Sequence, residues 1–582
     1  MRKIIWLFLS LLLIVSFCTV STVAASSETL LELPSDDGTG YPVTGITDSY
    51  NNNDDITKLI VPNNIVRVGE CAFFGCSNLN QISLHDKVQV IGENAFKDTA
   101  YYEDEDNWEN GVLYIGDCLI EADPKMVSGA YTVKPGTRLI ADGAFKDCKE
   151  LSSIIIPDSV EYVGTDAFVG TAYFLNKNNW VNNALFLKHV LVSFDKEYRG
   201  AYFVPRGIKT IADGAFVSSK VTKVTTPDSM RYIGYNAFGD CRELNMISIG
   251  KAVETLGRGP FRMCTELKAI NVHVDNEHFV VVGNVLYDKQ LSTVIRCPQK
   301  LVGKVVLPNS IMRINAYAFE WCDEIKNVSI PEGCVFIGNS AFSSCKNLED
   351  VVIPETMEYI DSAAFSYCES IETVTIPDYV HYLGRKAFSY CTNLRDVQIG
   401  KGVTELRSSL FECCEKLNGV ILGENIVEID ASVFYSTKYL IDVSNYKNGL
   451  LILSDKYLIK VGQDVTSCYI PSGIKVIADG AFEYLSEESV LSSIHIPSSV
   501  INLNCSAFYG VSNTIPVYYD GTVKEFEDIA NYDLRYTNLY TNDYYVAIWS
   551  IVVSVGVYCV FTIGVWGINY KKKEMSNYKS EG

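Results

Sequence analysis

The sequence predicts a mainly β solenoid, built as a right-handed parallel stack of about fifteen 23-residue coils. A first observation is a column of phenylalanines between residues 308 and 434, spaced at one constant interval. A second is a cysteine three residues after most of these rings, and a third is a short apolar run that ends at proline or glycine. Such a fixed period is typical of repeat proteins, whose units contact only their neighbours. The six rings are Phe319, Phe342, Phe365, Phe388, Phe411 and Phe434.

One unit, residues 348–365, shows how a coil is expected to fold. Leu348, Val351 and Ile353 place apolar side chains on one side of a short strand. Pro354 then ends the strand, because proline cannot donate a hydrogen bond to a ladder. A single coil cannot bury its own apolar face, so we expect stacked coils to share one core. Their strands would pair in parallel, about 4.8 Å apart.

The repeated pattern L-x-x-V-x-I-P followed by I-G-x-x-A-F-x-x-C resembles the BspA-like leucine-rich repeat of surface proteins in bacteria and some anaerobic protists. Ordinary leucine-rich repeats carry an asparagine after the strand, whereas proline or glycine stands there in this chain. The resemblance covers roughly residues 56–530. It implies a leucine-rich-repeat-like fold and a cell-surface adhesion or binding role, but it does not identify the ligand.

The acidic composition argues against nucleic acid as a partner. The chain carries 49 basic and 70 acidic side chains, a formal net charge of −21, whereas nucleic-acid binding needs a basic surface. The simplest interpretation of the excess is a solvated acidic surface. Hydrophobic residues make up 48% of the chain, which is enough for a continuous core.

Residues 1–25 are predicted to be a secretory signal peptide. Arg2 and Lys3 form its charged start, an apolar core follows, and the small residues 23–25 offer a cleavage site. The alternative is an uncleaved membrane anchor, although the apolar run is short for a span. Residues 26–55 are polar and rich in turn formers, and we expect an N-terminal lead-in or cap there.

The repeat solenoid is expected to occupy residues 56–514, with four interruptions of the ring spacing. Phe96 to Phe145, Phe168 to Phe216, Phe261 to Phe319 and Phe434 to Phe482 are 49, 48, 58 and 48 residues apart. Three of these spacers open with a tyrosine-containing segment, continue with two apolar runs and end in IADGAF. Paired apolar runs predict a β-hairpin. We expect these hairpins to protrude from one face, where their aromatic residues either contact a ligand or pack onto the next coil.

Residues 515–543 are predicted to form a C-terminal cap and a juxtamembrane segment. The stretch IPVYYDGTVKEFEDIA differs from the repeat and suggests a strand, a turn at Asp520-Gly521 and a short helix. These elements would cover the open end of the solenoid, since exposed strand edges need covering.

Residues 544–568 are predicted to be one C-terminal transmembrane helix, because they contain no charged side chain in 25 positions. About 20 apolar residues suffice to span a bilayer. The lysines at 571–573 follow at once and predict a cytoplasmic tail at residues 569–582, with the ectodomain outside. A buried core helix is the alternative. The predicted localisation is therefore the cell surface, as a single-pass plasma membrane protein.

Nine of the 18 cysteines lie three residues after a ring phenylalanine and predict a column of small buried groups. Neighbours in such a column would be close enough for a disulfide, but with parallel side chains. We expect mostly free buried thiols, with occasional bridges as the alternative. The nine are Cys76, Cys148, Cys241, Cys264, Cys322, Cys345, Cys368, Cys391 and Cys414.

No constellation of residues predicts an enzyme, a metal site or a cofactor site. The sequence carries no P-loop, nucleophile elbow, HExxH motif or CxxC pair. His273 and His278 flank acidic residues in HVDNEH, but this spacing is not an established ligand pattern.

The outer face of the strand ladder is the candidate ligand-binding surface. Side chains alternate along a strand, so the residues between the buried positions face solvent. They are mostly small and polar, which suits a protein or glycan surface, although they could equally be ordinary solvated strand residues. The candidates are Asn327, Ser329, Asp350, Val352, Thr373, Thr375, Asp396 and Gln398.

These features together predict a membrane-anchored adhesin or binding scaffold for host, matrix or neighbouring-cell ligands. The expected partner is an extracellular protein or glycan. The alternative is the ectodomain of a sensory receptor, which would need a partner subunit because its tail is too short for a catalytic domain.

Overall fold

The computed structural model describes residues 30–32, 45–46, 50–483, 490–504, 506–509, 511–512, 514–530 and 539–542. The predicted signal peptide, transmembrane segment and cytoplasmic tail lie outside these residues. Within the part that is described, no helix has the length and apolar character that a membrane crossing requires. The chain divides into two compact units, residues 1–192 and 193–582.

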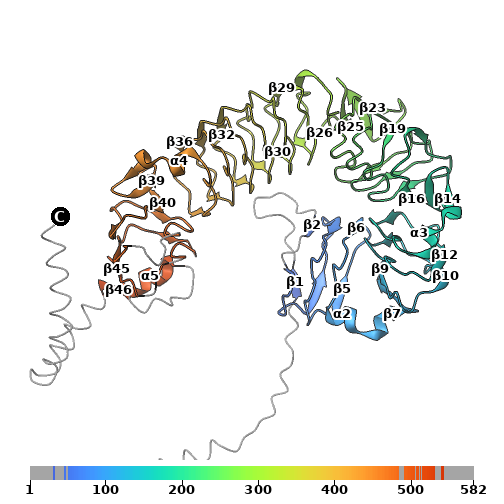
Figure 1. The fold of residues 1–582 in the computed structure, drawn as a ribbon, viewed down its shortest axis with the longest axis horizontal. Coiled ribbons are helices and arrows are strands. Elements are labelled where there is room, and N and C mark those ends of the chain that lie inside the picture. Colours follow the sequence, from blue (N-terminus) through green and yellow to red (C-terminus); the bar gives the residue numbers. More distant parts are fainter. Residues whose placement is uncertain are drawn as a thin grey trace, which may run out of the picture. The chain divides into compact units, whose positions relative to one another are not determined.

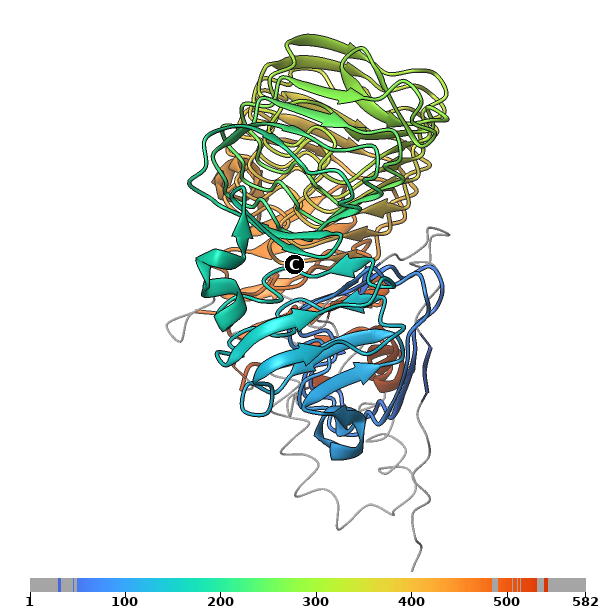
Figure 2. The ribbon, with the colours of Figure 1, turned by 90° about the vertical axis from the view of Figure 1, so that its right-hand side faces the viewer.

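The first unit stacks short strands and, in the described residues, includes four brief helical segments. Its strands lie side by side in blue and cyan (Figure 2). The elements are β1 (Leu30–Glu32), β2 (Gly45–Ile46), β3 (Lys58–Ile60), β4 (Arg67–Val68), β5 (Gln81–Ser83), β6 (Val90–Ile91), α2 (Ala100–Glu103), η2 (Glu105–Asn107), β7 (Trp108–Glu109), β8 (Val112–Ile115), β9 (Cys118–Ala122), β10 (Gly129–Thr132), β11 (Leu139–Ile140), β12 (Leu151–Ile155), β13 (Tyr162–Val163), α3 (Ala172–Leu175), η3 (Lys177–Asn179), β14 (Trp180–Val181), β15 (Ala184–Leu187) and β16 (Val190–Phe194).

The second unit continues the same design, and its coils follow one another from green to orange (Figure 1). Its elements are β17 (Gly200–Phe203), β18 (Thr210–Ile211), β19 (Val221–Thr225), β20 (Tyr232–Ile233), β21 (Met246–Ile249), β22 (Thr255–Leu256), β23 (Ala269–Val272), β24 (Phe279–Val282), β25 (Val285–Asp288), β26 (Thr293–Arg296), β27 (Gly303–Val306), β28 (Arg313–Ile314), β29 (Ile325–Ser329), β30 (Phe336–Ile337), β31 (Tyr359–Ile360), β32 (Thr373–Ile376), β33 (Tyr382–Leu383), β34 (Asp396–Ile399), β35 (Glu405–Leu406), β36 (Gly419–Ile421), β37 (Glu428–Ile429), α4 (Lys438–Ile441), η4 (Val443–Asn445), β38 (Tyr446–Lys447), β39 (Leu450–Leu453), β40 (Tyr457–Val461), β41 (Ser467–Tyr469), β42 (Val476–Ile477), β43 (Ser493–Ile496), β44 (Asn502–Leu503), β45 (Val517–Tyr519), α5 (Val523–Ile529) and β46 (Leu539–Tyr540).

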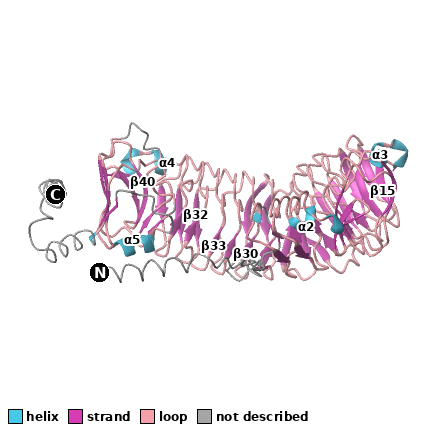
Figure 3. Ribbon diagram, turned by 90° about the horizontal axis from the view of Figure 1, so that it is seen from below, coloured by secondary structure: helices cyan, strands magenta, loops and turns pink. Residues whose placement is uncertain are grey.

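Most coils contribute two strands, so each unit carries two parallel ladders, and strands and loops alternate along the stack (Figure 3). We call them the first-strand ladder, exemplified by β32-β34-β36, and the second-strand ladder, exemplified by β28-β30-β31-β33. In the first, Thr373 pairs with Asp396, the equivalent residue of the next coil. The predicted parallel stack is therefore confirmed within each unit. The second-strand ladder was not predicted, because its two-residue strands leave almost no alternating pattern.

The ring phenylalanines form the predicted buried column. All fifteen ring positions are buried. In the second unit Phe365 lies between Phe342 and Phe388, with ring centroids 5.0 and 5.2 Å away and planes within 3° and 7° of parallel. These rings therefore pack face to face, and each ring covers one face of its neighbour in the next coil.

The ladder cysteines are buried free thiols in this structure, and each contacts the coil before it. The Cys368 thiol donates to the Phe342 carbonyl at 3.1 Å, and Cys391 donates to Phe365 at 3.2 Å. This bond explains the choice of cysteine over alanine, because the thiol is small, apolar and still a donor. The predicted burial of this column is confirmed.

The hairpins do not protrude, and that prediction was wrong. In the first unit β7, β8 and β9 take places in the second-strand ladder, in the order β13-β11-β9-β8-β7. All four side chains of β8 are buried, and β9 buries four of its five. Both faces of the hairpin are apolar, so it stabilises the core as an extra layer of the stack. Strands β38, β39 and β40 are built in the same way.

The repeat begins earlier than Ile56. Strand β1 pairs with β3 and β2 with β4, so residues before 50 already occupy coil positions. The ring of Tyr50 stacks on Phe73, with centroids 5.6 Å apart. The first ring is thus a tyrosine, which a search for phenylalanine spacing does not detect.

The C-terminal cap has the predicted strand and helix. Helix α5 starts with a capping box between Thr522 and Glu525 and buries Phe526 and Ile529. Strand β46 follows and pairs with β45 in parallel, which adds one more layer than expected.

Candidate functional site

Six of the eight candidate ligand-binding residues lie on first strands of the second unit, in β29, β32 and β34; Asp350 and Val352 lie in the equivalent segment of the coil between β29 and β32. Strands β32 and β34 alternate exposed and buried side chains, with Thr373, Thr375, Asp396 and Gln398 outward and apolar residues inward. Ser329, Asp350 and Val352 are also exposed, and Asn327 is half-buried. The predicted orientation is therefore confirmed, while ligand binding at these residues remains a prediction.

Neighbouring coils align these side chains into rows. Thr373 stands opposite Asp396, and Thr375 opposite Gln398, in adjacent parallel strands. In the preceding coils the Asn327 amide donates to the Asp350 carboxylate at 3.3 Å. The rows offer carboxylate, amide and hydroxyl groups repeated at the strand spacing, about 4.8 Å.

The ladder is less regular than the sequence suggested. Residues 350–353 form no strand and make one isolated bridge, between Asn327 and Asp350. The face also carries apolar side chains, since Val306, Val352 and Ile421 are 68%, 74% and 62% exposed. The candidate face is therefore mostly polar, with Val306 and Ile421 at its two ends and Val352 between Ser329 and Thr375.

An aromatic row replaces the polar row near the C-terminal end of the second unit. Tyr469, His495, Tyr518 and Tyr540 occupy outward positions of β41, β43, β45 and β46, with successive ring centroids 4.3, 4.6 and 5.0 Å apart. Burial lowers the pKa of His495 to about 4, so the imidazole is neutral at pH 7. The candidate residues chosen from the sequence do not include this row; the aromatic residues at matching positions of these strands were the signal that could have identified it.

A second aromatic stack runs along the second-strand ladder. The rings of Phe336, Tyr359 and Tyr382 stack with centroids 5.1 and 4.2 Å apart. Arg313 lies over one end, 4.0 Å from the Phe336 centroid, and Arg407 over the other, 4.6 Å from Tyr382. Each guanidinium makes a cation–π contact with the ring at its end of the stack, so a positive charge covers both terminal rings.

The aromatic residues of the hairpins act as internal braces. The Trp108 indole donates to the Tyr102 carbonyl at 2.7 Å and packs edge-on against the Tyr102 ring. Trp180 makes the same bond to Phe174 at 2.8 Å. Because both indole N–H groups are satisfied within the hairpin, packing explains these residues better than ligand contact.

The HVDNEH segment is organised by its asparagine. Buried Asn276 donates to the carbonyls of Gly250 and Val253 and accepts from the backbone of His278 and Phe279. Within the residues that the structure describes, no three His, Cys, Asp or Glu side chains are grouped so that they could hold a metal ion.

The repeat unit matches a known family over most of the chain. Residues 44–174, 201–301, 312–441, 361–487 and 455–546 match the BspA type leucine rich repeat region. The chain belongs to the BspA-type leucine-rich repeat family. In this BspA-type chain, the repeats build the two strand ladders, the column of ring phenylalanines and the column of buried thiols.

Several solved structures are similar to this BspA-type chain. A leucine rich cell surface protein from Faecalibacterium prausnitzii is 24% identical, covering 66% of this chain and 83% of its own, with a TM-score of 0.39. The pneumococcal vaccine antigen PcpA is 17% identical, covering 75% and 96%, with a TM-score of 0.36. A leucine-rich repeat protein from Eubacterium ventriosum is 18% identical, covering 78% and 83%, with a TM-score of 0.34. Among curated proteins, none matches this chain.

Proposed function

We propose that this BspA-type protein is a cell-surface adhesin, a binding scaffold for an extracellular protein or glycan ligand. The observation that carries the proposal is the exposed first-strand ladder, where chemically similar groups recur at equivalent positions of adjacent coils. A fold of this kind typically serves as a rigid scaffold, and its function depends on the side chains that it displays.

The repetition favours a ligand that is itself extended or repetitive. Each exposed threonine, aspartate or glutamine offers only a weak contact to a solvated partner. Several such contacts made at once act intramolecularly after the first, so the overall affinity exceeds that of any one contact. The apolar side chains of Val306 and Ile421 would add desolvated contacts at the margins of the face.

Membrane anchoring is the second part of the proposal. Residues 544–568 are uncharged and are followed by three lysines, and residues 1–25 have the composition of a signal peptide. This arrangement would hold the repeats outside the cell. Protease protection of the C-terminal tail in intact cells, with digestion of the repeats, is the result expected for that topology.

The ladder face is tested by a triple variant, Asp350→Lys, Thr373→Lys and Asp396→Lys, of the full chain displayed on cells. Because these side chains face solvent, the variant should fold normally and lose attachment in a panel of matrix proteins and glycans.

A matched control carries the same change of charge elsewhere. Glu332→Lys, Glu355→Lys and Thr404→Lys also replace two acids and one threonine, at exposed positions between the first and second strands. The control should attach as the wild type does. Equal attachment by the ladder variant, the control and the wild type would exclude the ladder face as the site.

A further inference from the structure

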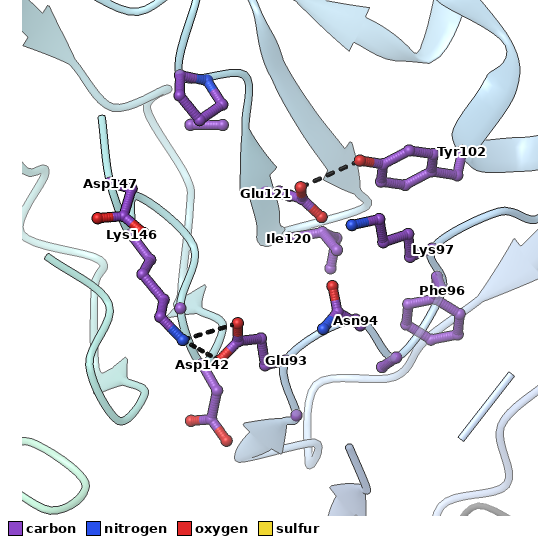
Figure 4. A pocket seen from close by; sticks show the side chains of 15 residues that line it. Glu93, Asn94, Phe96, Lys97, Tyr102, Ile120, Glu121, Asp142, Lys146 and Asp147 are labelled. Carbon is purple, nitrogen blue, oxygen red and sulfur yellow. Dashed lines mark hydrogen bonds and ion pairs between the residues drawn. The ribbon is translucent and has the colours of Figure 1, made fainter. Parts of the chain in front are cut away.

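A polar pocket of about 350 Å³ lies in the first unit, where the first hairpin joins the stack. Figure 4 shows it between the segment that carries Glu93 and Phe96, strand β9 with Ile120 and Glu121, and the turn that carries Asp142 and Lys146. The residues that line it have no part in the exposed ladder of the second unit.

Ala122 lines the pocket, and it is a small residue at a position where the two other hairpins of this type carry larger ones. Ala122 ends β9, and its N–H donates to Ala144 O at 2.7 Å; Phe194 and Val461 end β16 and β40 with the same bond to Ala215 and Ala481. The Phe194 ring stacks on the Phe216 ring, 4.3 Å away. Ala122 has no such ring; Tyr131 packs on Phe145, the equivalent of Phe216, with centroids 5.6 Å apart, and the pocket opens between Ala122 and Phe96.

Charged groups line the open volume. Lys146 Nζ donates to both oxygens of Glu93 at 2.9 Å, and the Tyr102 hydroxyl donates to Glu121 Oε1 at 3.0 Å. Burial raises the pKa of the Glu121 carboxyl, and it raises the pKa of Asp142 to about 6. Four carboxylates and two lysines line the pocket, so it keeps an excess of negative charge at neutral pH.

The hairpin formed by β38, β39 and β40 shows which chemical group fits at the position of Glu121. Lys460 of β40 stands at the position of Glu121, one residue before the strand end, and its ammonium donates to Gly480 O at 2.8 Å. Gly480 and Gly143 are equivalent: both have positive φ, 58° and 66°, and both carbonyls accept from the backbone three residues on. In that hairpin the chain's own ammonium group fills the place beside Gly480. In the first hairpin Glu121 stands there instead, with Lys97 nearby (Figure 4), and no ammonium group of the described residues donates to Gly143 O.

We propose that the pocket beside Glu121 binds a primary alkylammonium group, such as a lysine side chain or an N-terminus of a partner polypeptide. The ammonium would donate to Gly143 O, as Lys460 does to Gly480, and lie beside the Glu121 carboxylate. Its alkyl stem would pack against Phe96 and Ala122, which line the pocket. This site is separate from the ladder face, so either proposal can fail without the other.

Ligand-observed NMR with the full chain tests the site, with Nα-acetyl-lysine methylamide as the probe and its Nε-acetylated form as the neutral control. The amine should bind and the acetylated form should not. Glu121→Gln keeps an acceptor for Tyr102 and should weaken binding about tenfold, because a charge-assisted contact becomes a neutral one.

Two further variants fill the pocket in the ways that the chain itself uses. Glu121→Lys copies Lys460, and Ala122→Phe copies Phe194; each should abolish binding. Glu105→Gln, an exposed carboxylate outside the pocket, should leave binding unchanged. Circular dichroism verifies that each variant is folded. Equal binding of the amine and its acetylated form, or undiminished binding by folded Glu121→Gln, would overturn the proposal.

Discussion

The uninterrupted run of residues 308–434 and the hairpin-bearing coils share one repeat pattern but differ in the contacts between neighbouring coils. In the run, the thiols of Cys345, Cys368, Cys391 and Cys414 donate to the backbone carbonyl of the ring phenylalanine in the preceding coil at 3.0 to 3.2 Å. Each inner ring has a neighbour on both sides. At the first hairpin the equivalent thiol of Cys148 is 3.8 Å from Ala122 O, and Ala122 supplies no ring.

The two regions show how a regular repeat and an interrupted repeat arrange side chains differently. Coils of the same design produce columns of equivalent contacts and rows of mostly polar surface groups, which suit an extended ligand. A hairpin breaks the columns and brings unlike residues together, and the outcome depends on single positions: a ring at Phe194, an ammonium at Lys460 and an open pocket at Ala122. Variants of equivalent residues in the two regions can therefore separate the two effects.

The largest effect is expected for Phe365→Ala in the uninterrupted run. Phe365 is fully buried between two parallel rings, and truncation of a buried aromatic side chain costs about 3–5 kcal/mol. In a repeat array the loss should be centred on adjacent coils. Hydrogen exchange should show faster exchange around β31 and β33 than in distant coils.

Phe96→Ala gives the contrast at the first hairpin. Phe96 is equally buried, but its other side faces the pocket, and among the described rings Phe73 is the one stacked on it, at 5.7 Å. The free energy of unfolding should fall less for this variant than for Phe365→Ala. Equal losses of unfolding free energy in the two variants would show that stacking on a second ring adds no stability beyond the burial of the phenylalanine side chain.

A smaller loss is expected when the helical turn that opens a hairpin loses its cap. The buried Thr171 hydroxyl donates to Phe168 O at 2.8 Å and accepts from Phe174 N at 3.0 Å. Thr171→Ala should cost about 1–2 kcal/mol, the range of lost N-caps. Thr171→Ser should restore most of it, measured by denaturant unfolding; no recovery would point to the methyl group instead.

Cysteine variants should separate the two regions further. Cys368→Ala removes a bond of 3.1 Å to Phe342 O and should cost about 1 kcal/mol. Cys148→Ala removes a contact of only 3.8 Å and should cost less. Burial also raises the pKa of Cys368, so native alkylation followed by mass spectrometry should label it more slowly than half-buried Cys413. Fast labelling of Cys368, or a disulfide to its neighbours, would contradict the buried-thiol column.

The fold could be predicted from the sequence because its signals repeat. Phe342 and Phe365 are separated by one full repeat, as are Cys345 and Cys368, so one correctly interpreted coil determines its neighbours. The hairpins were located by their paired apolar runs, but their placement was wrong, because pattern alone does not distinguish a strand buried on both faces from one that projects. The pocket could not be predicted, because it depends on Ala122, a single small residue at a position visible only when three non-identical spacers are superposed.

The last prediction concerns the pH dependence of stability at the pocket, tested with Asp142→Asn. The pKa of Asp142 is raised from 3.8 to about 6, chiefly because the carboxyl is buried and also because Asp166 and Glu93 lie nearby; the hydrogen bond from the Thr165 N–H and the charge of Arg67 oppose this shift. The folded state therefore takes up a proton between pH 6 and pH 4 that the unfolded chain does not yet hold. Linkage then requires this carboxyl to favour folding increasingly as pH falls through that window, and to lose that contribution as pH rises through 6.

Asparagine cannot titrate, yet its side-chain oxygen can still accept the Thr165 N–H that bonds to Asp142 Oδ1 at 2.7 Å. The free energy of unfolding of the wild type minus that of the variant should therefore decrease from pH 4 to pH 6 and level off above. Denaturant unfolding at several pH values measures this difference. A constant difference would mean that Asp142 is solvated like an ordinary carboxylate, and that the pocket is more open to water than its lining indicates.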